Sequence, residues 1–488
     1  MHACCLNCAD RRSAVKPYNY LKNNQTRETT YGRRWIERGR HFINAPWAGG
    51  AILVLFVIVA LVLANCESTK ELYHEFLSTS LSLSIGEGGR FFNFELDIEK
   101  FINDGLMVVF FFVVGLEIKR ELLVGRLSTV KQAMLPVMAA VGGMIVPAAI
   151  YAAFNAGTEY SAGWGIPMAT DIAFAIAILS LMGSKVPVSL KIFLTALAIV
   201  DDLGAIVVIA IFYTYKINWI CLAVIAVLVA VLYVLRKRGV TKVAPYLITA
   251  IVVWYLFYRS GVHATISGVM MAMLIPSKPL LSKKMFLHRE RYCAEEFRFH
   301  DREGVEVLQN EDQHHALLKL RKTATDAIGM SQRMEHLLHP WVTFLIMPVF
   351  ALGNAGVEVH ADALNIFAST LGTGIFLGLV IGKPVGIFLA SWLSVKLKIA
   401  VLPRGIKWLP LLGVACMGGI GFTMSIFIDT LAFAGGHEII NQAKIAILIS
   451  SVSAAVLGYA FISAFEGVRN RNKSKYLRRS MHNLSKNS

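Results

Sequence analysis

Residues 188–213 read VSLKIFLTALAIVDDLGAIVVIAIFY, an apolar run with two adjacent aspartates, Asp201 and Asp202, near its middle. An α-helix rises about 1.5 Å per residue, so about 20 apolar residues cross the roughly 30 Å core of a membrane. The run is therefore long enough to span a bilayer. It also places two carboxyl groups at a depth where each ionisable side chain costs at least about 2.5 kcal/mol, so each aspartate needs a structural or functional reason.

The rest of the chain has the same apolar character. Of its 488 residues, 56% are hydrophobic and only 16% are charged, and the mean hydropathy is +0.57. This composition is too apolar for soluble domains of that length and predicts an all-α integral membrane protein with about 12 transmembrane helices. We place the helices near residues 47–64, 102–116, 133–154, 165–181, 188–213, 219–235, 244–258, 262–275, 337–352, 371–393, 409–428 and 439–465.

The net charge of +16 lies mainly in alternate gaps between these blocks. Basic residues favour the cytoplasmic side during insertion, so the pattern indicates membrane topology rather than binding to nucleic acid. Every second gap is basic, and the intervening gaps are acidic or nearly neutral. Both termini are therefore expected in the cytoplasm. Examples are Lys119, Arg120, Arg236, Lys396 and Arg469 in the basic gaps and Glu67, Glu159, Glu358 and Glu438 in the others.

The blocks divide the chain into five predicted segments. A basic, cysteine-bearing cytoplasmic extension (1–44) precedes spans 1–8 (45–276), and a polar cytoplasmic insertion (277–335) separates these from spans 9–12 (336–466) and a basic cytoplasmic tail (467–488). The extension is too long and too basic for a cleavable signal peptide. The insertion is predicted to be a loop or a small amphipathic element, and its histidines are too widely spread for a metal site.

Three of the seven cysteines, Cys4, Cys5 and Cys8, cluster in the extension. A disulfide framework is not expected in a reducing compartment. A metal site built from these three cysteines alone stays open as an alternative.

Four ionisable residues lie far from any predicted membrane surface: Asp171, Asp201, Asp202 and Lys383. Adjacent positions on a helix point about 100° apart, so Asp201 and Asp202 cannot share one role. One carboxylate can pair with Lys383, while the other faces a water-filled funnel where oxygen ligands suit a small, hard cation. Titratable groups that share such a site can also exchange protons.

The backbone near these residues is rich in helix breakers. Pro167 precedes Thr170 and Asp171 in the fourth block, and residues 417–423 of the eleventh block read MGGIGFT. Interrupted spans in the two halves of a transporter indicate discontinuous helices that cross at a transport site. Spans 4 and 11 run in opposite directions, as an inverted repeat requires. Ordinary close packing of helices through glycines is the alternative. In broken helices, Asp171 and Lys383 have suitable signs to compensate the partial charges of the half-helix ends.

The chain resembles the NhaA-type sodium/proton antiporters from about residue 45 to residue 465, with several long motifs in the same order. The resemblance implies the inverted-repeat antiporter fold and an electrogenic, pH-activated exchange of Na+ or Li+ for H+ by alternating access. It also implies that the protein lies in a bacterial inner membrane, in contact with membrane lipids, and serves sodium and pH homeostasis. The family resemblance further suggests a homodimer. The motifs are VGLEIKREL (114–122), ATDIAFA (169–175), AIVDDLGA (198–205), SGVHAT (260–265), HLLHPW (336–341), IGKP (381–384) and GIGFTMSIFI (419–428).

The same resemblance implies roles for individual residues. Asp202 is the principal carboxylate for Na+ or Li+ and for protons, without a structural metal, and Asp201 exchanges an ion pair with Lys383. Residues that support the crossing of the broken helices are Thr170, Asp171, Gly418, Gly419 and Gly421. Candidates for the response to pH are Glu117, Arg120, Glu121, Arg333, Glu335 and His339 at predicted span ends, with His263 as a less certain member.

Two other classes of protein remain as alternatives. A sodium-coupled symporter for an organic solute would use a similar inverted-repeat design. An intramembrane aspartyl protease would use two buried aspartates, but neither candidate aspartate here lies in a Gly-x-Gly-Asp motif, and that chemistry has no role for Lys383. No phosphate loop of the form GxxxxGK[S/T] occurs, so we expect a secondary active transporter that needs neither ATP nor a cofactor and is not an enzyme.

Overall fold

The computed structural model is helical along most of its described length. It describes residues 45, 47–85, 92–125, 129–183, 186–214, 217–301, 305, 307, 309–359, 366–402 and 406–486. Residues 1–44, with Cys4, Cys5 and Cys8, lie outside this part of the chain, and so do the last two residues of the predicted tail. The metal-site alternative for the three cysteines is therefore not addressed by the structure.

The described residues include nine helices that are long and apolar enough to cross a membrane, or up to eleven spans if each of two bent helix pairs counts as one. The all-α membrane fold is thus confirmed, while the count of 12 stays a prediction. Six of the nine are single helices: α2 (Ala48–Asn65), α6 (Val130–Asn155), α8 (Val188–Phe212), α9 (Trp219–Lys237), α10 (Val243–Ser260) and α20 (His437–Lys486). The other three are composite: Ile98–Leu123 ends in α5 (Met107–Leu123); Met330–Asn354 comprises α14 (Met330–Trp341), η7 (Val342–Ile346) and α15 (Met347–Asn354); and Thr370–Lys396 comprises α16 (Thr370–Leu377), η9 (Gly378–Gly382) and α17 (Lys383–Lys396).

The two bent pairs coincide with the predicted spans 4 and 11. The first joins the 3₁₀ segment η5 (Glu159–Met168) to α7 (Ile172–Leu181) at an angle of 42°. The second joins α18 (Trp408–Gly418) to α19 (Phe422–Ala432) at an angle of 43°. Each break falls on the proline or glycine cluster that the sequence analysis identified.

The predicted span at 262–275 is a helix of only ten residues, α11 (Thr265–Leu274). Helix α10 ends at Ser260 and is capped by Gly261, whose φ of 79° lies in the left-handed region that favours glycine, and α11 begins at Thr265. At the other end of α11, Lys119 of α5 donates hydrogen bonds to the carbonyl oxygens of Ala272, Met273 and Ile275. Lys119 therefore caps a buried helix end, whereas the sequence analysis assigned it to a cytoplasmic gap.

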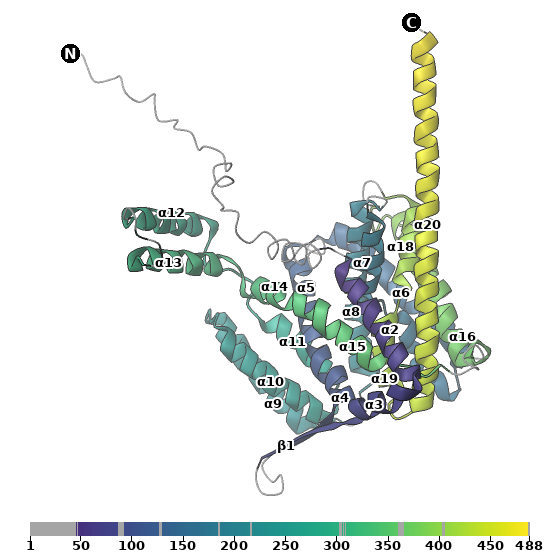
Figure 1. Ribbon diagram of the computed structural model, residues 1–488, viewed down its shortest axis with the longest axis horizontal. Coiled ribbons are helices and arrows are strands. Elements are labelled where there is room, and N and C mark those ends of the chain that lie inside the picture. The colour runs from purple at the N-terminus through teal and green to yellow at the C-terminus, as the bar shows by residue number, and fades with distance from the viewer. Residues whose placement is uncertain are drawn as a thin grey trace.

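The helices form two apolar clusters. The larger cluster includes Phe111 of α5, Leu197 of α8, Leu379 of η9 and Phe427 of α19. The smaller cluster joins α9, α10 and α11 to Leu116 of α5. Figure 1 shows α9 and α10 on one side of the bundle and α20 on the other. The bent pairs lie within the larger cluster, so the broken backbone is enclosed by protein.

A β-hairpin lies at one end of the bundle and was not predicted. Strands β1 (Ser80–Ile85) and β2 (Phe92–Asp97) pair antiparallel, with Ser80 opposite Asp97 and Ile85 opposite Phe92. The sequence of β1, SLSLSI, alternates polar and apolar residues with the period of a strand. This signal was present in the sequence, but hydropathy windows of membrane-span length average it away.

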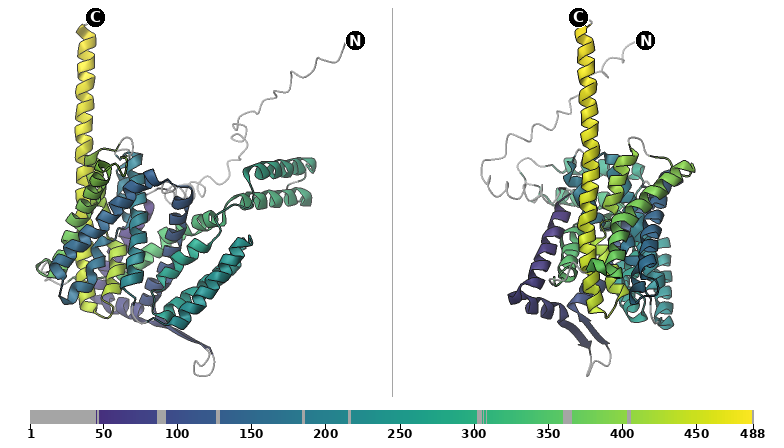
Figure 2. Two further views of the ribbon diagram at one scale, coloured as in Figure 1. Left: turned by 180° about the vertical axis from the view of Figure 1, so that it is seen from behind. Right: turned by 90° about the vertical axis from the view of Figure 1, so that its right-hand side faces the viewer.

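Helix α3 (Glu67–Ser78) lies at the same end of the bundle (Figure 2). Tyr73 donates a hydrogen bond of 2.6 Å from its Oη to the carbonyl oxygen of Leu352 in α15, and burial raises the pKa of Tyr73 to about 12. The phenol therefore stays protonated and remains a donor at every physiological pH. A Cβ atom at Gly356 would lie 2.1 Å from Tyr73 Oη, so this close approach requires glycine.

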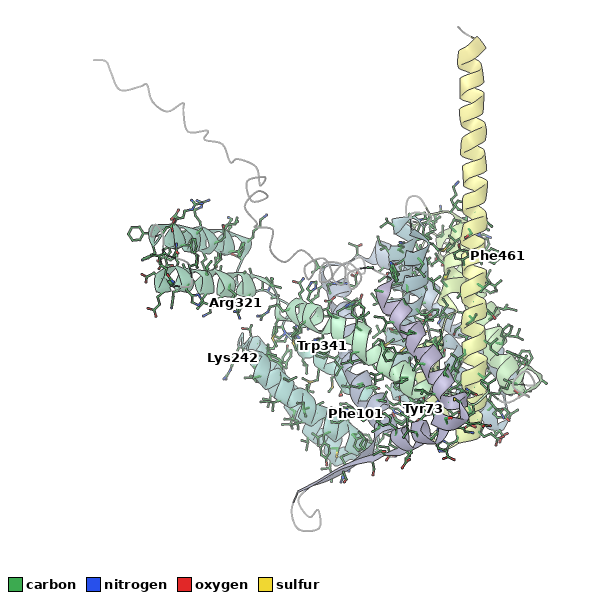
Figure 3. All side chains as sticks on the ribbon, in the orientation of Figure 1. Tyr73, Phe101, Lys242, Arg321, Trp341 and Phe461 are labelled. Atoms are coloured by element: carbon green, nitrogen blue, oxygen red, sulfur yellow. The ribbon has the colours of Figure 1, made fainter. Side chains whose placement is uncertain are left out.

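The predicted insertion contains a pair of helices, α12 (Lys283–Phe299) and α13 (Glu311–Ala327), which pack against each other and project from the bundle (Figure 1). Figure 3 shows the side chain of Arg321 on α13, away from the bundle. At the C-terminal end, α20 continues as one helix from the last span to Lys486 and extends beyond the bundle at the end opposite the hairpin.

Replacing Lys119 with methionine should destabilise the protein, because the carbonyl oxygens of Ala272 and Ile275 lose this donor, whereas that of Met273 keeps a hydrogen bond from Arg236. A buried polar group that loses its partner costs about 1–3 kcal/mol. The measurement is the thermal unfolding midpoint in detergent. The control is Lys237→Met, which alters an exposed lysine at the end of α9. Equal midpoints for the two variants would contradict the capping role.

Candidate functional site

The break between η5 and α7 is built around Asp171. Pro167 lies near the end of η5, and the backbone of Ala169 and Asp171 is extended, so the helical hydrogen-bond ladder stops here. Asp171 is the N-cap of α7, and its Oδ1 accepts a hydrogen bond of 2.9 Å from the backbone N–H of Phe174. The carboxylate thus satisfies an open donor at the start of a half-helix.

The break between α18 and α19 relies on glycines. α18 ends at Gly418, and α19 begins at Phe422. A Cβ atom at Gly419 would lie 2.4 Å from the carbonyl oxygen of Leu379 in η9, so only glycine allows this approach. At the start of α19, the backbone N–H of Phe422 donates to Ser451 Oγ of α20 at 3.1 Å.

The two breaks lie in direct contact. Asp171 donates from its backbone N–H to the carbonyl oxygen of Ile420 at 2.7 Å, and Thr170 Oγ1 donates to the carbonyl oxygen of Gly418 at 2.8 Å. Asp171 Oδ2 accepts from Thr423 Oγ1 at 2.6 Å and from the backbone N–H of Thr423 at 3.2 Å. One carboxylate therefore caps the N-termini of α7 and α19 together. Polar backbone groups at membrane depth need such partners.

Lys383 enters the same region from span 10. The π-helical turn η9 directly precedes it, and Pro384 follows it. Lys383 is fully buried, and its Nζ donates to Asp201 Oδ2 at 2.5 Å and to the carbonyl oxygen of Met168 at the end of η5. The lysine thus pairs with one aspartate and also binds the C-terminal end of a half-helix, where a positive charge is favourable.

Asp202 has a different environment from its neighbour. It is 1% exposed, and neither carboxylate oxygen has a hydrogen-bond partner within the part of the chain that the structure describes. Asp202 lines a cavity of about 400 Å³ together with Asp171, Thr423, Glu117 and His339. Asp201 does not line this cavity. The two adjacent aspartates therefore divide between an ion pair and a cavity.

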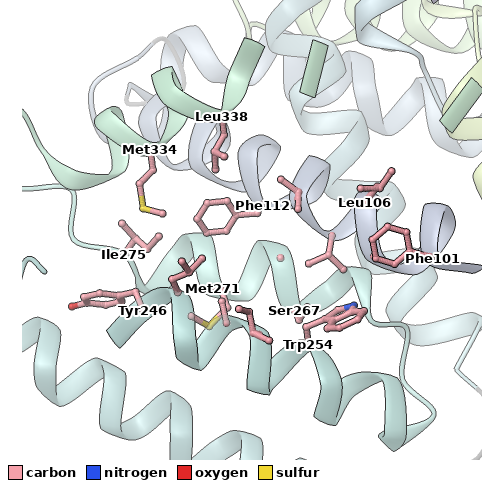
Figure 4. Close-up of a pocket in the computed structure, with 17 residues that line it drawn as sticks. Phe101, Leu106, Phe112, Tyr246, Trp254, Ser267, Met271, Ile275, Met334 and Leu338 are labelled. Atoms are coloured by element: carbon pink, nitrogen blue, oxygen red, sulfur yellow. The ribbon is translucent and has the colours of Figure 1, made fainter. Parts of the chain in front are cut away.

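A second cavity, of about 370 Å³, lies between α5, α10, α11 and α14 (Figure 4). Its lining is almost entirely apolar, and the polar side chains in it are Tyr246, Trp254 and Ser267. No carboxylate lines it, so the cavity with Asp202 is the better candidate for a cation site. Among the described residues, no group of three or more metal-ligating side chains converges.

Most of the pH-response candidates lie together beside the Asp202 cavity. Arg120 binds Glu335 at 2.8 Å through Nη1, and it binds Glu121 at 3.3 Å and Glu117 at 3.8 Å through Nη2. These contacts link the end of α5 to α14, and His339 of α14 lines the cavity with Glu117.

The other two candidates do not join this cluster. Arg333 lies on α14, and its buried Nε has no hydrogen-bond partner in the described ranges. His263 lies between α10 and α11, and its Nε2 is 2.6 Å from the carbonyl oxygen of Tyr213 at the end of α8. The contact of His263 with Tyr213 joins two helix ends, so its geometry indicates a structural partner.

Three buried polar residues of this region were not predicted to have a role in it. Thr423 was quoted within a motif but was given no role as the partner of Asp171. Asp429 lies one residue beyond the predicted end of span 11, and Lys444 lies within predicted span 12 without having been counted among the intramembrane charges. Asp429 is 0% exposed and Lys444 is 6% exposed. A search for charges a few residues beyond each span end would have found the aspartate.

Comparison with known proteins finds sequence relatives over most of the chain. The model of the family described as Na+/H+ antiporter 1 matches residues 40–462. The Na(+)/H(+) antiporter NhaA of Oleidesulfovibrio alaskensis is 46% identical over 420 residues, which cover 86% of this chain and 92% of that protein. The protein of the same name from Sulfurimonas denitrificans is 45% identical over 423 residues, which cover 86% of this chain and 94% of that protein. The one from Shigella dysenteriae serotype 1 is 44% identical over 427 residues, which cover 86% of this chain and 96% of that protein.

Replacing Thr423 with valine removes one hydroxyl donor from Asp171 and keeps the shape of the side chain. Hydrogen bonds to charged groups contribute about 1.5–3 kcal/mol, so the free energy of unfolding should fall by about that amount. Thr430→Val is the matched control, because the Thr430 hydroxyl bonds to the carbonyl oxygen of Phe427 in its own helix. Unfolding in detergent compares them, and an equal loss in both variants would contradict the role of Thr423.

Proposed function

Since the chain belongs to the Na+/H+ antiporter 1 family, we propose that it is a secondary active transporter that exports Na+ in exchange for H+. The observation that carries this proposal is the environment of Asp202. Its buried carboxylate faces a cavity with neither oxygen in a hydrogen bond, and the adjacent Asp201 is paired with Lys383. An unpaired carboxylate at membrane depth is costly, and a proton or a small cation would each relieve that cost.

The proposed mechanism is competition for one site. Na+ or Li+ prefers oxygen ligands, and Asp202 offers two carboxylate oxygens to the cavity. Asp201 Oδ1 also has no hydrogen-bond partner among the described residues, so this carboxylate can leave Lys383 and join a bound cation. When the cation leaves, one proton adds to the Asp202 carboxylate, and a second adds to Lys383, whose ammonium group then pairs again with the Asp201 carboxylate. More protons than sodium ions move per cycle, so the exchange is electrogenic.

The broken helices supply the mobile element of this mechanism. Asp171 caps the N-termini of α7 and α19, and Lys383 binds the last carbonyl of η5. Each charge has the sign that compensates the adjacent half-helix end. Lys383 therefore couples the charge state of Asp201 to the backbone of span 4. We propose that alternating access follows from a shift of these half-helices when the site is loaded with a cation or with protons.

We assign the response to pH to the cluster of Arg120 with Glu335, Glu121 and Glu117. This cluster joins α5 to α14 beside the cavity, which His339 also lines. Protonation of its carboxylates weakens the ion pairs that connect these two helices. We expect activity to rise with pH.

The topology that we propose has both termini in the cytoplasm of a bacterium and the protein in its inner membrane. The alternation of basic and acidic gaps supports this orientation. The hairpin and α3 then lie at the outer end of the bundle (Figure 2). Export of Na+ with import of H+ in this orientation serves sodium and pH homeostasis. The family resemblance suggests a homodimer.

Replacing Asp202 with asparagine should abolish exchange, because the amide can neither carry a charge for the cation nor exchange the proton. We expect sodium-evoked proton movement in proteoliposomes to fall at least about tenfold, which corresponds to a loss of about 1.4 kcal/mol. Asp312→Asn, on the exposed first turn of α13, is the control and should keep the wild-type rate.

The same measurement separates the alternatives. Wild-type protein that moves no protons in response to Na+ at any alkaline pH would refute the antiporter and favour a sodium-coupled symporter, which labelled solutes would then test. Full activity of Asp202→Asn would show that Asp202 is not the carboxylate that binds the cation and the proton. The protease alternative gains nothing from the geometry, because Asp201 is held by Lys383.

A further inference from the structure

A second pair of opposite charges is buried in α19 and α20, away from the cavity. Asp429 of α19 is 0% exposed, and Lys444 of α20 is 6% exposed. Neither carboxylate oxygen of Asp429 has a hydrogen-bond partner in the part of the chain that the structure describes. The mechanism proposed above uses neither residue.

The register of the two antiparallel helices places these residues opposite each other. The backbone N–H of Phe422 donates to Ser451 Oγ at 3.1 Å, which fixes the register near the break. Seven residues from Phe422 toward the hairpin end lead to Asp429, and seven residues from Ser451 in the same direction lead to Lys444. Seven residues are about two helical turns and about 10 Å, so Asp429 and Lys444 lie at the same level of the two helices, and each interacts electrostatically with the other.

Asp429 also faces the outer half of span 4. Ser425, Asp429 and Phe433 are spaced four residues apart and share one side of α19. Ser425 Oγ donates to the carbonyl oxygen of Ile166 in η5 at 2.8 Å. A Cβ atom at Gly163 of η5 would lie 2.8 Å from the ring of Phe433. The carboxylate therefore lies in the wedge between α19, α20 and η5, about 9 Å along α19 from Thr423.

Few other titratable groups act on this pair. Tyr151 of α6 interacts electrostatically with Asp429, and Glu99 interacts with Lys444. The packed segment η5 carries Glu159, which is exposed, and Tyr160, which is half-buried. Of the other neighbours of α19 and α20, α7, α15, α16 and η9 carry no titratable residue, and α18 carries Cys416. Lys444 is thus the one positive charge among the groups that act on Asp429 in the described chain.

Stability alone is a poor reason for such a pair. Replacing a buried ion pair with apolar residues of similar volume is often neutral or stabilising. A metal cation is also a poor occupant, because it needs several oxygen ligands and would face the Lys444 ammonium group. A proton needs no additional ligands and removes the charge of the carboxylate. The two open oxygens of Asp429 therefore suit a proton.

We propose that Asp429, positioned by Lys444, is a proton-transfer site on the outer route to the central carboxylates. This inference rests on the proposed antiport and on the proposed orientation. A proton from the external water adds to the Asp429 carboxylate and leaves the Lys444 ammonium group as the remaining charge. The proton then passes inward to Asp202, and the Asp429–Lys444 pair is restored. Ser425 provides a hydroxyl on the same side of α19, one turn closer to the break.

The test measures sodium-evoked proton movement in everted and right-side-out vesicles, with the pH of each side set separately. In Asp429→Asn, we expect the maximal rate to fall at least fivefold and its dependence on outer pH to flatten, with half-saturation by Na+ at the inner side within twofold of wild type. Asp429→Glu should restore the dependence on outer pH. Thr430→Val, the neighbouring residue on α19, is the control and should behave as wild type.

A double variant separates proton transfer from folding. Asp429→Leu with Lys444→Met replaces the pair with apolar side chains, so we expect a thermal midpoint near that of wild type and the same loss of outer pH dependence. A folded double variant with the wild-type dependence on outer pH would overturn the proposal. A rate lowered equally at every outer pH, with a lower midpoint, would assign the pair a structural role and overturn it as well. Absence of proton movement in wild type would instead refute the antiport itself.

Discussion

The arrangement of this bundle depends on one carboxylate that joins two broken helices. Asp171 accepts hydrogen bonds from the first turns of α7 and α19, while its own backbone N–H donates to Ile420. Unpaired backbone groups cost several kcal/mol each in a membrane, so two broken spans are tolerated only when each satisfies the other. The proline and glycines that break the spans and the aspartate that caps them form one unit. Around that unit, the remaining helices bring Lys383, Asp201 and Asp202 together.

The division of labour between Asp201 and Asp202 follows from helix geometry. Adjacent residues on α8 point about 100° apart, so one reaches Lys383 and the other reaches the cavity. Because Lys383 also donates to Met168, a change in the charge of Asp201 acts directly on the end of η5. Charge at the site and backbone geometry at the break are therefore linked through a single ammonium group. In the proposed mechanism, this link allows ion binding and a change of access to occur together.

Much of this fold was predictable from local patterns. Apolar blocks located the membrane helices, and breaker residues located both bends. The separate positions of the two aspartates also followed from helical periodicity. Contacts between distant segments were not predictable, because no local pattern indicates that Thr423 binds Asp171 or that Lys119 caps α11. Hydropathy windows also concealed short or marginal features: the alternation in β1, the short helix α11, and Asp429 at the edge of a span. The antiport chemistry came from several long motifs taken together, whereas the charges alone left a symporter open.

Competition between sodium and protons at Asp202 is the central claim, and calorimetric titration of the purified protein with Na+ tests it most directly. Falling pH protonates the carboxylate, so Na+ affinity should weaken by at least about tenfold per pH unit once protons occupy the site, because a charged ligand must be deprotonated to bind the cation. Titrations in buffers of different ionisation enthalpy should show proton release on Na+ binding. Asp202→Asn should show neither binding nor release. Sodium binding that is independent of pH, or that survives in Asp202→Asn with the same proton release, would contradict the account.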